Sequence, residues 1–315
     1  MYRSKLLWVF LWVLPFSISA QYDWSVGGYL GASSYLGSVG GGSTPAKAFI
    51  YDVNFPSTRF GLGGFVNYKL NPRFSFEAIL AMDRISASDN QSSYLPRELR
   101  NLSFRDDIYN LDLLAQIYVF EIPGLVQNFK LNIDLRCYVT GGVNFFHFNP
   151  EGQYDGQWYS LEPLHTEGVS YSLWGVGIPM GFGSYVSVNR KHRIGLELLW
   201  TKTFTDDLDD NGNDSHNPGR YVDPSTLSSP AAVALANPSN EIVSKFEGNA
   251  AAEKLLSYNY QPGGLRSAVK GKDDSWFTYS VTYAYAIRGK SSFYRSKYPG
   301  LFGKSMKKRK IRAKF

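Results

Sequence analysis

Apolar and polar residues alternate with a period of two along most of the chain. In 58–70, Phe60 and Leu62 share one face while Gly61 and Asn67 share the other. Successive side chains of a β-strand point to opposite faces, so this alternation predicts a strand with one apolar face. Seven further segments show the alternation or a richness in β-forming residues, namely 22–36, 73–87, 108–121, 129–148, 171–188, 193–205 and 276–288. The sequence therefore predicts an all-β protein of eight strands.

The lengths of these segments and of their connections favour a membrane barrel over the alternative, a soluble β-sandwich. The segments run to 13–20 residues, whereas strands of soluble proteins have a mode of about 5–6. Short and long connections take turns along the chain, namely 37–57, 71–72, 88–102, 122–128, 149–170, 189–192 and 206–275. Outer-membrane barrels have this arrangement, with long loops outside and short turns in the periplasm. We expect an eight-stranded antiparallel transmembrane β-barrel with long extracellular loops and a periplasmic C-terminus.

Composition and the polar faces of the strands agree with this fold. The 22 Tyr, 21 Phe and 30 Gly suit strands better than helices, and the lone Cys137 excludes an internal disulfide. Side chains fill the lumen of a barrel of about eight strands. We therefore expect the charged residues of the polar faces to point inward and pair with one another; they are Arg59, Lys69, Arg73, Glu77, Asp83, Asp112 and Glu197.

The first twenty residues have the features of a secretory signal peptide. Arg3 and Lys5 are positive, an apolar stretch runs over 6–18, and small residues precede a cleavage site that we place after Ala20. The apolar stretch is shorter than the ~20 residues that a membrane-spanning helix needs. The sequence thus divides into a signal peptide (1–20), an outer-membrane barrel (21–288) and a basic periplasmic tail (289–315).

The positive charge of the protein is concentrated in this tail. Eleven Lys or Arg and no acid lie between Arg288 and Phe315, and because the whole chain has a formal charge of +6, the preceding residues together carry −5. Behind a signal peptide, such a run is expected to contact lipid headgroups or an acidic periplasmic partner rather than nucleic acid. The candidate partner-binding residues are Arg295, Lys297, Lys304, Lys307, Lys308, Arg309, Lys310 and Arg312.

An acidic loop is the strongest candidate for a metal site. Asp207, Asp209 and Asn211 with Gly212 match the opening of a calcium-binding loop, but Pro218 stands where the closing Glu is required. We therefore expect neither a metal nor another cofactor, and keep calcium as the weaker alternative. The Ala-rich stretch 230–257, in the same connection, is expected to form a short surface helix.

The sequence contains little that indicates a catalytic site. His165 with Ser160 and Glu167 supplies the residue types of a hydrolase triad, which at a barrel mouth would make a lipid-modifying enzyme. Their spacing is generic and no motif indicates a nucleophile. We expect no enzymatic activity.

Four stretches resemble a known family. They are WSVGGYLGASSYLG from Trp24, RNLSFR over 100–105, FNPEGQYDGQWYSLEPLHTEG over 148–168 and FTDDLDD over 204–210. Together they resemble the PorG-type outer-membrane barrel of the type IX secretion system of Bacteroidetes, over most of 22–288. The chain departs from that pattern at His165, where a Gly is expected, and in the length of its basic tail.

This resemblance implies a non-enzymatic component of the secretion and gliding machinery. Such a protein would tie a periplasmic ring, made by a lipoprotein and its partner protein, to the outer membrane and its lipopolysaccharide. The tail and short turns would face the ring. The loop residues of the resembling stretches are expected to pack loop against loop; they are Asn101, Arg105, Trp158, Glu167, Asp206, Asp209 and Asp210. A generic small barrel for adhesion or envelope integrity is the alternative.

Overall fold

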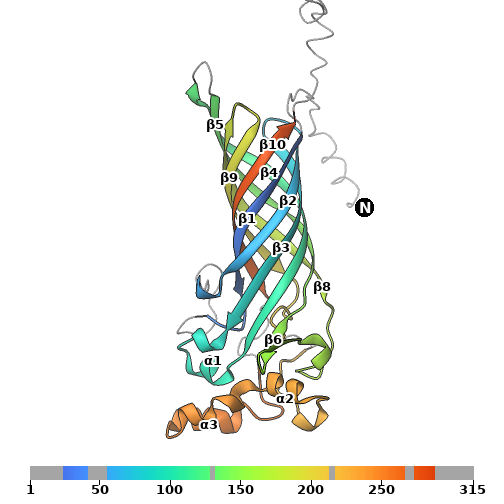
Figure 1. Cartoon of the computed structure of the whole chain (residues 1–315), viewed down its shortest axis with the longest axis vertical. Helices are drawn as coiled ribbons and strands as arrows, with labels where there is room; N and C mark the ends of the chain where they lie inside the picture. Colours follow the sequence, from blue (N-terminus) through green and yellow to red (C-terminus); the bar gives the residue numbers. More distant parts are fainter. Residues whose placement is uncertain (1–23, 42–54, 128–131, 213–216, 267–272, 288–315) are drawn as a thin grey trace, which may run out of the picture.

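Eight long strands close into an antiparallel barrel in the computed structural model of the chain (Figure 1). The structure describes residues 24–41, 55–127, 132–212, 217–266 and 273–287. Each barrel strand pairs with the barrel strands before and after it in the chain, and the last, β10, pairs with the first, β1, so that no barrel strand remains as an edge. The barrel strands are β1 (Trp24–Leu36), β2 (Arg59–Lys69), β3 (Phe74–Ser88), β4 (Ser103–Gln127), β5 (Asn132–His147), β8 (Trp174–Val188), β9 (His192–Thr203) and β10 (Ser275–Ile287). The predicted eight-stranded barrel is confirmed.

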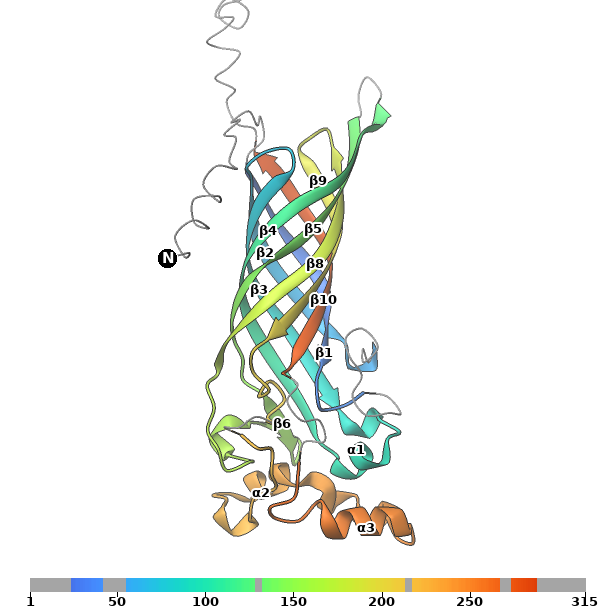
Figure 2. The ribbon, with the colours of Figure 1, turned by 180° about the vertical axis from the view of Figure 1, so that it is seen from behind.

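Short and long connections lie at opposite ends of the barrel. The short turns, the first residue of β1 and the last residue of β10 lie at one end, called the turn end (Figure 1). The long connections gather at the other, called the loop end, together with α1 (Leu95–Arg100), α2 (Pro230–Ala236) and α3 (Ala250–Tyr258) (Figure 2). None of the described helices is long and apolar enough to cross a membrane.

The outer face of the barrel is apolar and the lumen is mostly polar, as the alternation predicts. Leu30, Leu80 and Phe182 are 71, 67 and 60 % exposed on the outside. Inside, Asn67 donates to Glu77 at 3.1 Å and to Gln116 at 2.9 Å. Exposed apolar surface over every strand is unfavourable in water and suits the hydrocarbon region of a bilayer.

Two of the expected inward charges do not point into the lumen. Lys69, Glu77, Asp83 and Asp112 are buried, and Glu197 also lines the lumen. Arg59, in contrast, is exposed at the first position of β2 and donates to the carbonyls of Pro56 and Thr58, and Arg73 is exposed in the turn before β3. Both residues lie at the ends of their strands, where the alternation no longer fixes a side chain to one face.

The link expected over 122–128 is largely strand. Ile122 and Val126 of β4 pair with β5, and a shift of register between them accommodates Pro123 and Gly124. The amide of Gly124 is satisfied by the Asp134 carboxylate at 2.8 Å. A β-bulge explains why a Pro-Gly pair does not end the strand here.

One long connection contains a further hairpin that the alternation did not predict. Strands β6 (Glu151–Tyr154) and β7 (Gln157–Ser160) pair with each other, and β6 contacts β4 through Glu151 and Arg105. Asp155 and Gly156 form its turn with φ of 50° and 76°. An Asp-Gly pair is a strong hairpin turn, so the sequence contains the relevant signal. The helix expected over 230–257 is present as α2 and α3, separated by 3-10 turns over 238–246.

Candidate functional site

The long loops pack together over the loop end and form a single buried assembly, here called the loop cap. It comprises 37–41, 89–102, 148–173 and the described parts of 204–274. Its apolar centre continues into the barrel mouth, where Phe146, Phe148 and Leu208 are completely buried beside Trp276. A second cluster joins α1 to the α3 segment through Leu99 and its neighbours Tyr221, Ala252 and Tyr260. The cap therefore has its own hydrophobic core.

Arg100 links three loops inside this cap. Its Nε lies 2.7 Å from Asp89 Oδ2, and the two side chains are 3 and 0 % exposed. Its Nη2 donates to the Ser38 carbonyl at 2.8 Å and its Nη1 to the Arg266 carbonyl at 3.1 Å. A planar guanidinium with several donors can satisfy carboxylate and carbonyl oxygens from different segments at once.

Arg266, whose carbonyl accepts from Arg100, links further segments of the cap in the same way. Its Nη1 lies 3.2 Å from Glu167 Oε1 and 3.5 Å from Asp210 Oδ2, and it also donates to the Asp210 carbonyl at 2.6 Å. Its Nη2 donates to the carbonyl of Leu235 in α2 at 3.2 Å. Glu167 in turn accepts from the amide of Gly212 at 3.0 Å. Arg266 thus joins Glu167 and Asp210, which lie in two of the resembling stretches, to helix α2.

Asp209 fixes the first loop to the last. It accepts from Tyr35 Oη at 2.5 Å, Ser38 Oγ at 2.8 Å and the amide of Val39 at 3.2 Å. Tyr35 Oη also lies 2.7 Å from Asp274 Oδ1. A hydroxyl has one hydrogen to donate, so one of the two carboxyls carries the second proton. Burial and the nearby Asp209 and Asp206 raise the pKa of Asp274 well above its usual range, which favours the protonated form of this carboxyl.

The remaining loop residues of the resembling stretches also make contacts between loops. Asn101 Nδ2 donates to the Pro238 carbonyl at 3.3 Å. Arg105 Nε lies 2.7 Å from Glu151 Oε2, and its guanidinium carbon lies 3.8 Å from the centroid of the Trp158 ring. Arg105 and Glu151 are each about 30 % exposed, so this pair lies at the rim of the cap rather than inside it.

The acidic loop is engaged by the protein itself. Asp207 accepts from Thr205 Oγ1 at 3.1 Å, and the backbone N–H of Asn211 donates to Asp209 Oδ1 at 3.1 Å. The described residues contain no group of three or more His, Cys, Asp or Glu side chains arranged to hold a metal ion. Asp206 is buried, and burial together with Asp209, Asp207 and Asp273 raises its pKa to about 9. The Asp206 carboxyl is therefore neutral at physiological pH.

The residues of the hydrolase alternative are engaged elsewhere. Ser160 Oγ accepts from Asn149 Nδ2 at 2.9 Å, and Glu167 is bound to Arg266 and Gly212. His165 is exposed and adopts a left-handed backbone conformation with φ of 48°. The expected basic residues of the tail lie outside the described residues.

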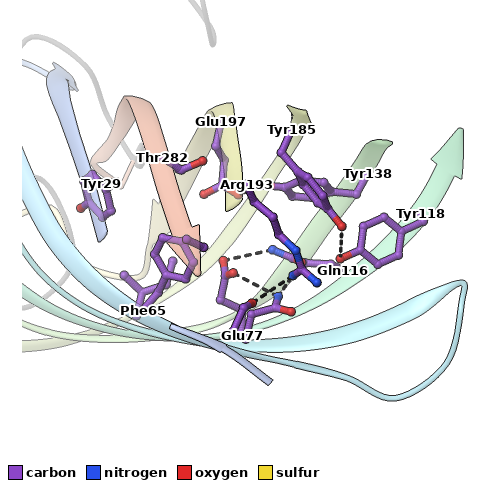
Figure 3. Close-up of a pocket in the computed structure, with 14 residues that line it drawn as sticks. Tyr29, Phe65, Glu77, Gln116, Tyr118, Tyr138, Tyr185, Arg193, Glu197 and Thr282 are labelled. Carbon is purple, nitrogen blue, oxygen red and sulfur yellow. Dashed lines mark hydrogen bonds between the residues drawn. The ribbon is translucent and has the colours of Figure 1, made fainter. Parts of the chain in front are cut away.

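The turn end of the lumen contains a second cluster, in which three tyrosines lie beside Arg193 (Figure 3). The rings of Tyr118, Tyr138 and Tyr185 lie within 5.9–6.2 Å of one another. Tyr138 Oη donates to Glu197 at 2.6 Å. Beside the rings is a cavity of about 30 Å³, which Arg193 also lines. A cavity of this size holds about one or two water molecules.

The sequence offered no indication of the two central residues Asp89 and Arg266. Each is an isolated charged residue in a long connection without a pattern. Asp89 pairs with Arg100, 11 positions away in the same connection, whereas Arg266 pairs with Glu167 of another loop. Tyr35 was placed on a strand, but its hydroxyl contacts residues 174 and 239 positions away. Co-variation between such positions is the signal that would identify them.

A closed barrel of eight antiparallel strands, with an apolar outer face and a polar, filled lumen, defines this molecule as an outer-membrane β-barrel protein. The chain belongs to the family described as Domain of unknown function (DUF6089), whose model matches residues 3–222. No curated protein matches the chain.

Several solved structures of outer-membrane proteins are similar to the chain at low sequence identity. OprG from Pseudomonas aeruginosa is 11 % identical with a TM-score of 0.37, covering 85 % of this chain and 97 % of its own. Ail, the attachment invasion locus protein of Yersinia pestis, is 9 % identical with a TM-score of 0.32, covering 85 and 100 %. A major outer membrane protein from Thermus thermophilus is 12 % identical with a TM-score of 0.28, covering 84 and 99 %.

Proposed function

We propose that this barrel is a non-enzymatic outer-membrane component of the type IX secretion and gliding machinery, and that it anchors the periplasmic ring to the outer membrane. One observation carries the proposal. The loop residues that resemble the PorG-type barrel form the framework of the loop cap, where Glu167 and Asp210 bind Arg266 and Asp209 binds Tyr35. The resembling residues thus maintain the loop cap, which lies at the opposite end of the barrel from the turn end.

The filled lumen supports an anchoring role over a transport role. Two cavities along the lumen measure about 30 and 10 Å³, and side chains such as Tyr29 and Glu197 line both. Volumes of this size admit single water molecules but not a nutrient or a polypeptide. In this proposal the barrel holds its position in the membrane, contacts lipid and lipopolysaccharide along its outer face and cap, and presents the basic tail to the ring lipoprotein and its partner.

Affinity purification of the tagged protein from its native membrane, with mass spectrometry of the recovered partners, tests the proposal. We expect the ring lipoprotein and its partner to be recovered, and truncation after Arg288 to reduce their recovery while the barrel still inserts. Undiminished recovery after truncation would remove the tail from the mechanism.

Deletion of the gene separates the proposal from its alternatives. Cargo of the secretion system retained inside the cells supports the proposal. A leaky envelope or lost adhesion with normal secretion would indicate a generic small barrel instead. Altered lipid A would indicate a lipid-modifying enzyme.

A further inference from the structure

Three basic side chains converge on the tyrosine cluster at the turn end of the lumen. Lys69 Nζ lies 5.2 Å from the centroid of the Tyr118 ring, and the guanidinium carbon of Arg136 lies 5.8 Å from the same centroid. The guanidinium carbon of Arg193 lies 5.3 Å from the centroid of Tyr185. Arg136 and Arg193 both act electrostatically on Lys69, and the low dielectric of a barrel interior strengthens this repulsion between like charges.

Two carboxyls line the cavity beside this cluster but are held by neutral partners. Glu77 accepts from Asn67 and Gln116, and Glu197 accepts from Tyr138. Glu121 Oε1 lies 2.5 Å from Arg136 Nη2, and both side chains are partly exposed. Arg193 Nη1 donates to the neutral Ser25 hydroxyl at 3.0 Å. Lys69 is only 9 % exposed, and no carboxylate of the described residues forms an ion pair with it. Arg136 Nε is buried and has no hydrogen-bond partner among the described residues.

Lys69 is thus a buried cation without a counter-ion among the described residues, which is costly, so the cluster indicates a site that an anion completes. We propose that the turn-end mouth of the lumen, formed by Lys69, Arg136 and Arg193 around Tyr118 and Tyr185, is a binding site for carboxylate side chains of an acidic protein segment. That this segment belongs to the periplasmic ring rests on the function proposed above; the anion site itself does not.

The position of the cations favours an acidic protein segment over lipid phosphate. Lys69 and Arg193 belong to the inner face of the wall, whereas lipid headgroups surround the outer flank of a barrel. Exposed Arg73, Arg190 and Lys191 lie in the neighbouring turns and extend the positive charge over the end face. A ligand that approaches along the barrel axis meets all of these charges, which would accelerate its association electrostatically.

Binding of a fluorescent hexaglutamate peptide to the full chain in uncharged detergent tests the site, with hexaglutamine as the matched uncharged probe. We expect hexaglutamate alone to bind, with an affinity that falls as salt is added. Lys69→Gln and Arg193→Gln should each weaken binding about tenfold, which corresponds to about 1.4 kcal/mol. Arg59→Gln removes the same charge from the loop end and should leave binding unchanged. Equal affinities for all three variants would overturn the proposal.

A second measurement locates the peptide, because the tail also attracts it. Carbodiimide coupling joins a peptide carboxylate to a lysine amine, and mass spectrometry identifies the lysine. Coupling at Lys69 supports the site, and coupling confined to the tail lysines would contradict it. Circular dichroism of each variant checks that the barrel has folded.

Two further outcomes concern the source of the anion. Inorganic phosphate is added to the bound hexaglutamate at an equal concentration of charge. If phosphate displaces the peptide, the site binds phosphate rather than an acidic segment, and the proposal is overturned. Asp23 directly precedes β1, and Asp23→Asn should leave the affinity unchanged; tighter binding in Asp23→Asn would show that the chain neutralises its own cluster, which also overturns the proposal. Failure of the peptide to bind while the ring still co-purifies would refute this inference alone.

Discussion

Individual arginines organise the interior of the loop cap. Arg100 contacts Ser38, Asp89 and Arg266, which belong to three different loops. Arg266 contacts three further segments through Glu167, Asp210 and Leu235. Replacing a buried ion pair with apolar residues often costs nothing in stability, so the pairs are better understood as fixing which loops meet. Each guanidinium has donors in a rigid plane, and few alternative loop arrangements would satisfy all of them.

Removing one partner of such a pair should be far more costly than removing an exposed one. Arg100→Ala leaves the Asp89 carboxylate buried without its cation, and we expect the free energy of unfolding to fall by about 3–5 kcal/mol. Lys245→Ala, the matched control, breaks the exposed pair with Glu98, where the Lys245 side chain is 57 % exposed, and should cost about 0–1 kcal/mol. Urea unfolding in detergent measures both. Equal effects of the two substitutions would show that Arg100 is not essential to the cap.

The stability of the loop cap is expected to depend on pH through Asp206. Burial and neighbouring acids raise its pKa to about 9 in the folded protein, against an ordinary value of about 3.9. Between these values the folded state holds a proton that the unfolded state has released, so stability falls as the pH rises and levels off above about 9. We expect limited proteolysis of the cap to accelerate from pH 6 to pH 9. Asp206→Asn, which stays neutral, should flatten this dependence, and an unchanged slope would assign it to other groups.

At the scale of strands, close backbone approach determines where glycine is required. A Cβ at Gly142 in β5 would lie 2.0 Å from the carbonyl oxygen of Leu113 in β4, whereas a Cβ at the adjacent Gly141 finds no atom nearer than 3.7 Å. The backbone of β4 cannot move aside without breaking the ladder between the two strands.

Gly142→Ala and Gly141→Ala therefore form a matched pair of substitutions. We expect Gly142→Ala to lower the yield of folded barrel and to destabilise it by about 1–3 kcal/mol, the usual cost of overpacking. Gly141→Ala should change stability by less than about 0.5 kcal/mol. Refolding into detergent, followed by electrophoretic mobility before and after heating, measures the folded fraction. Similar yields for both variants would show that the β4–β5 pair can relax.

The sequence predicted the barrel strands well because a strand that faces lipid on one side alternates strictly. The prediction was wrong or incomplete where pairing with a neighbouring strand, or a turn inside a loop, determines the structure instead. Ile122, Val126 and the intervening Pro-Gly pair belong to a bulged strand, since pairing with β5 outweighs the local turn preference. The β6–β7 hairpin is short and lies in a loop, so it has too few alternating residues to be recognised without its Asp-Gly turn.

At the scale of the molecule, the alternation of link lengths predicted both the closure and the division into two ends. The contacts within the cap could not be predicted in the same way. Tyr35, Asp89, Arg100 and Asp209 meet only because the barrel brings distant loops to one mouth, and no local pattern encodes such a meeting. Glu167 was expected to bond across loops, but its partner Arg266 was not identified.

The separation of the loop end from the turn end predicts how the barrel is oriented in the outer membrane. If the loop cap faces outward, a cysteine placed at exposed Lys254 in α3 should react with a membrane-impermeant maleimide on intact cells. A cysteine at exposed Lys191 in the turn between β8 and β9 should react only after the outer membrane is permeabilised.

The native Cys137 is replaced by serine in both proteins, so that each has a single thiol. The side chains of Lys254 and Lys191 form no hydrogen bond or ion pair with the described residues, so differences in labelling report accessibility rather than folding. Labelling of Lys191→Cys but not Lys254→Cys on intact cells would reverse the orientation and place the cap, rather than the basic tail, in the periplasm.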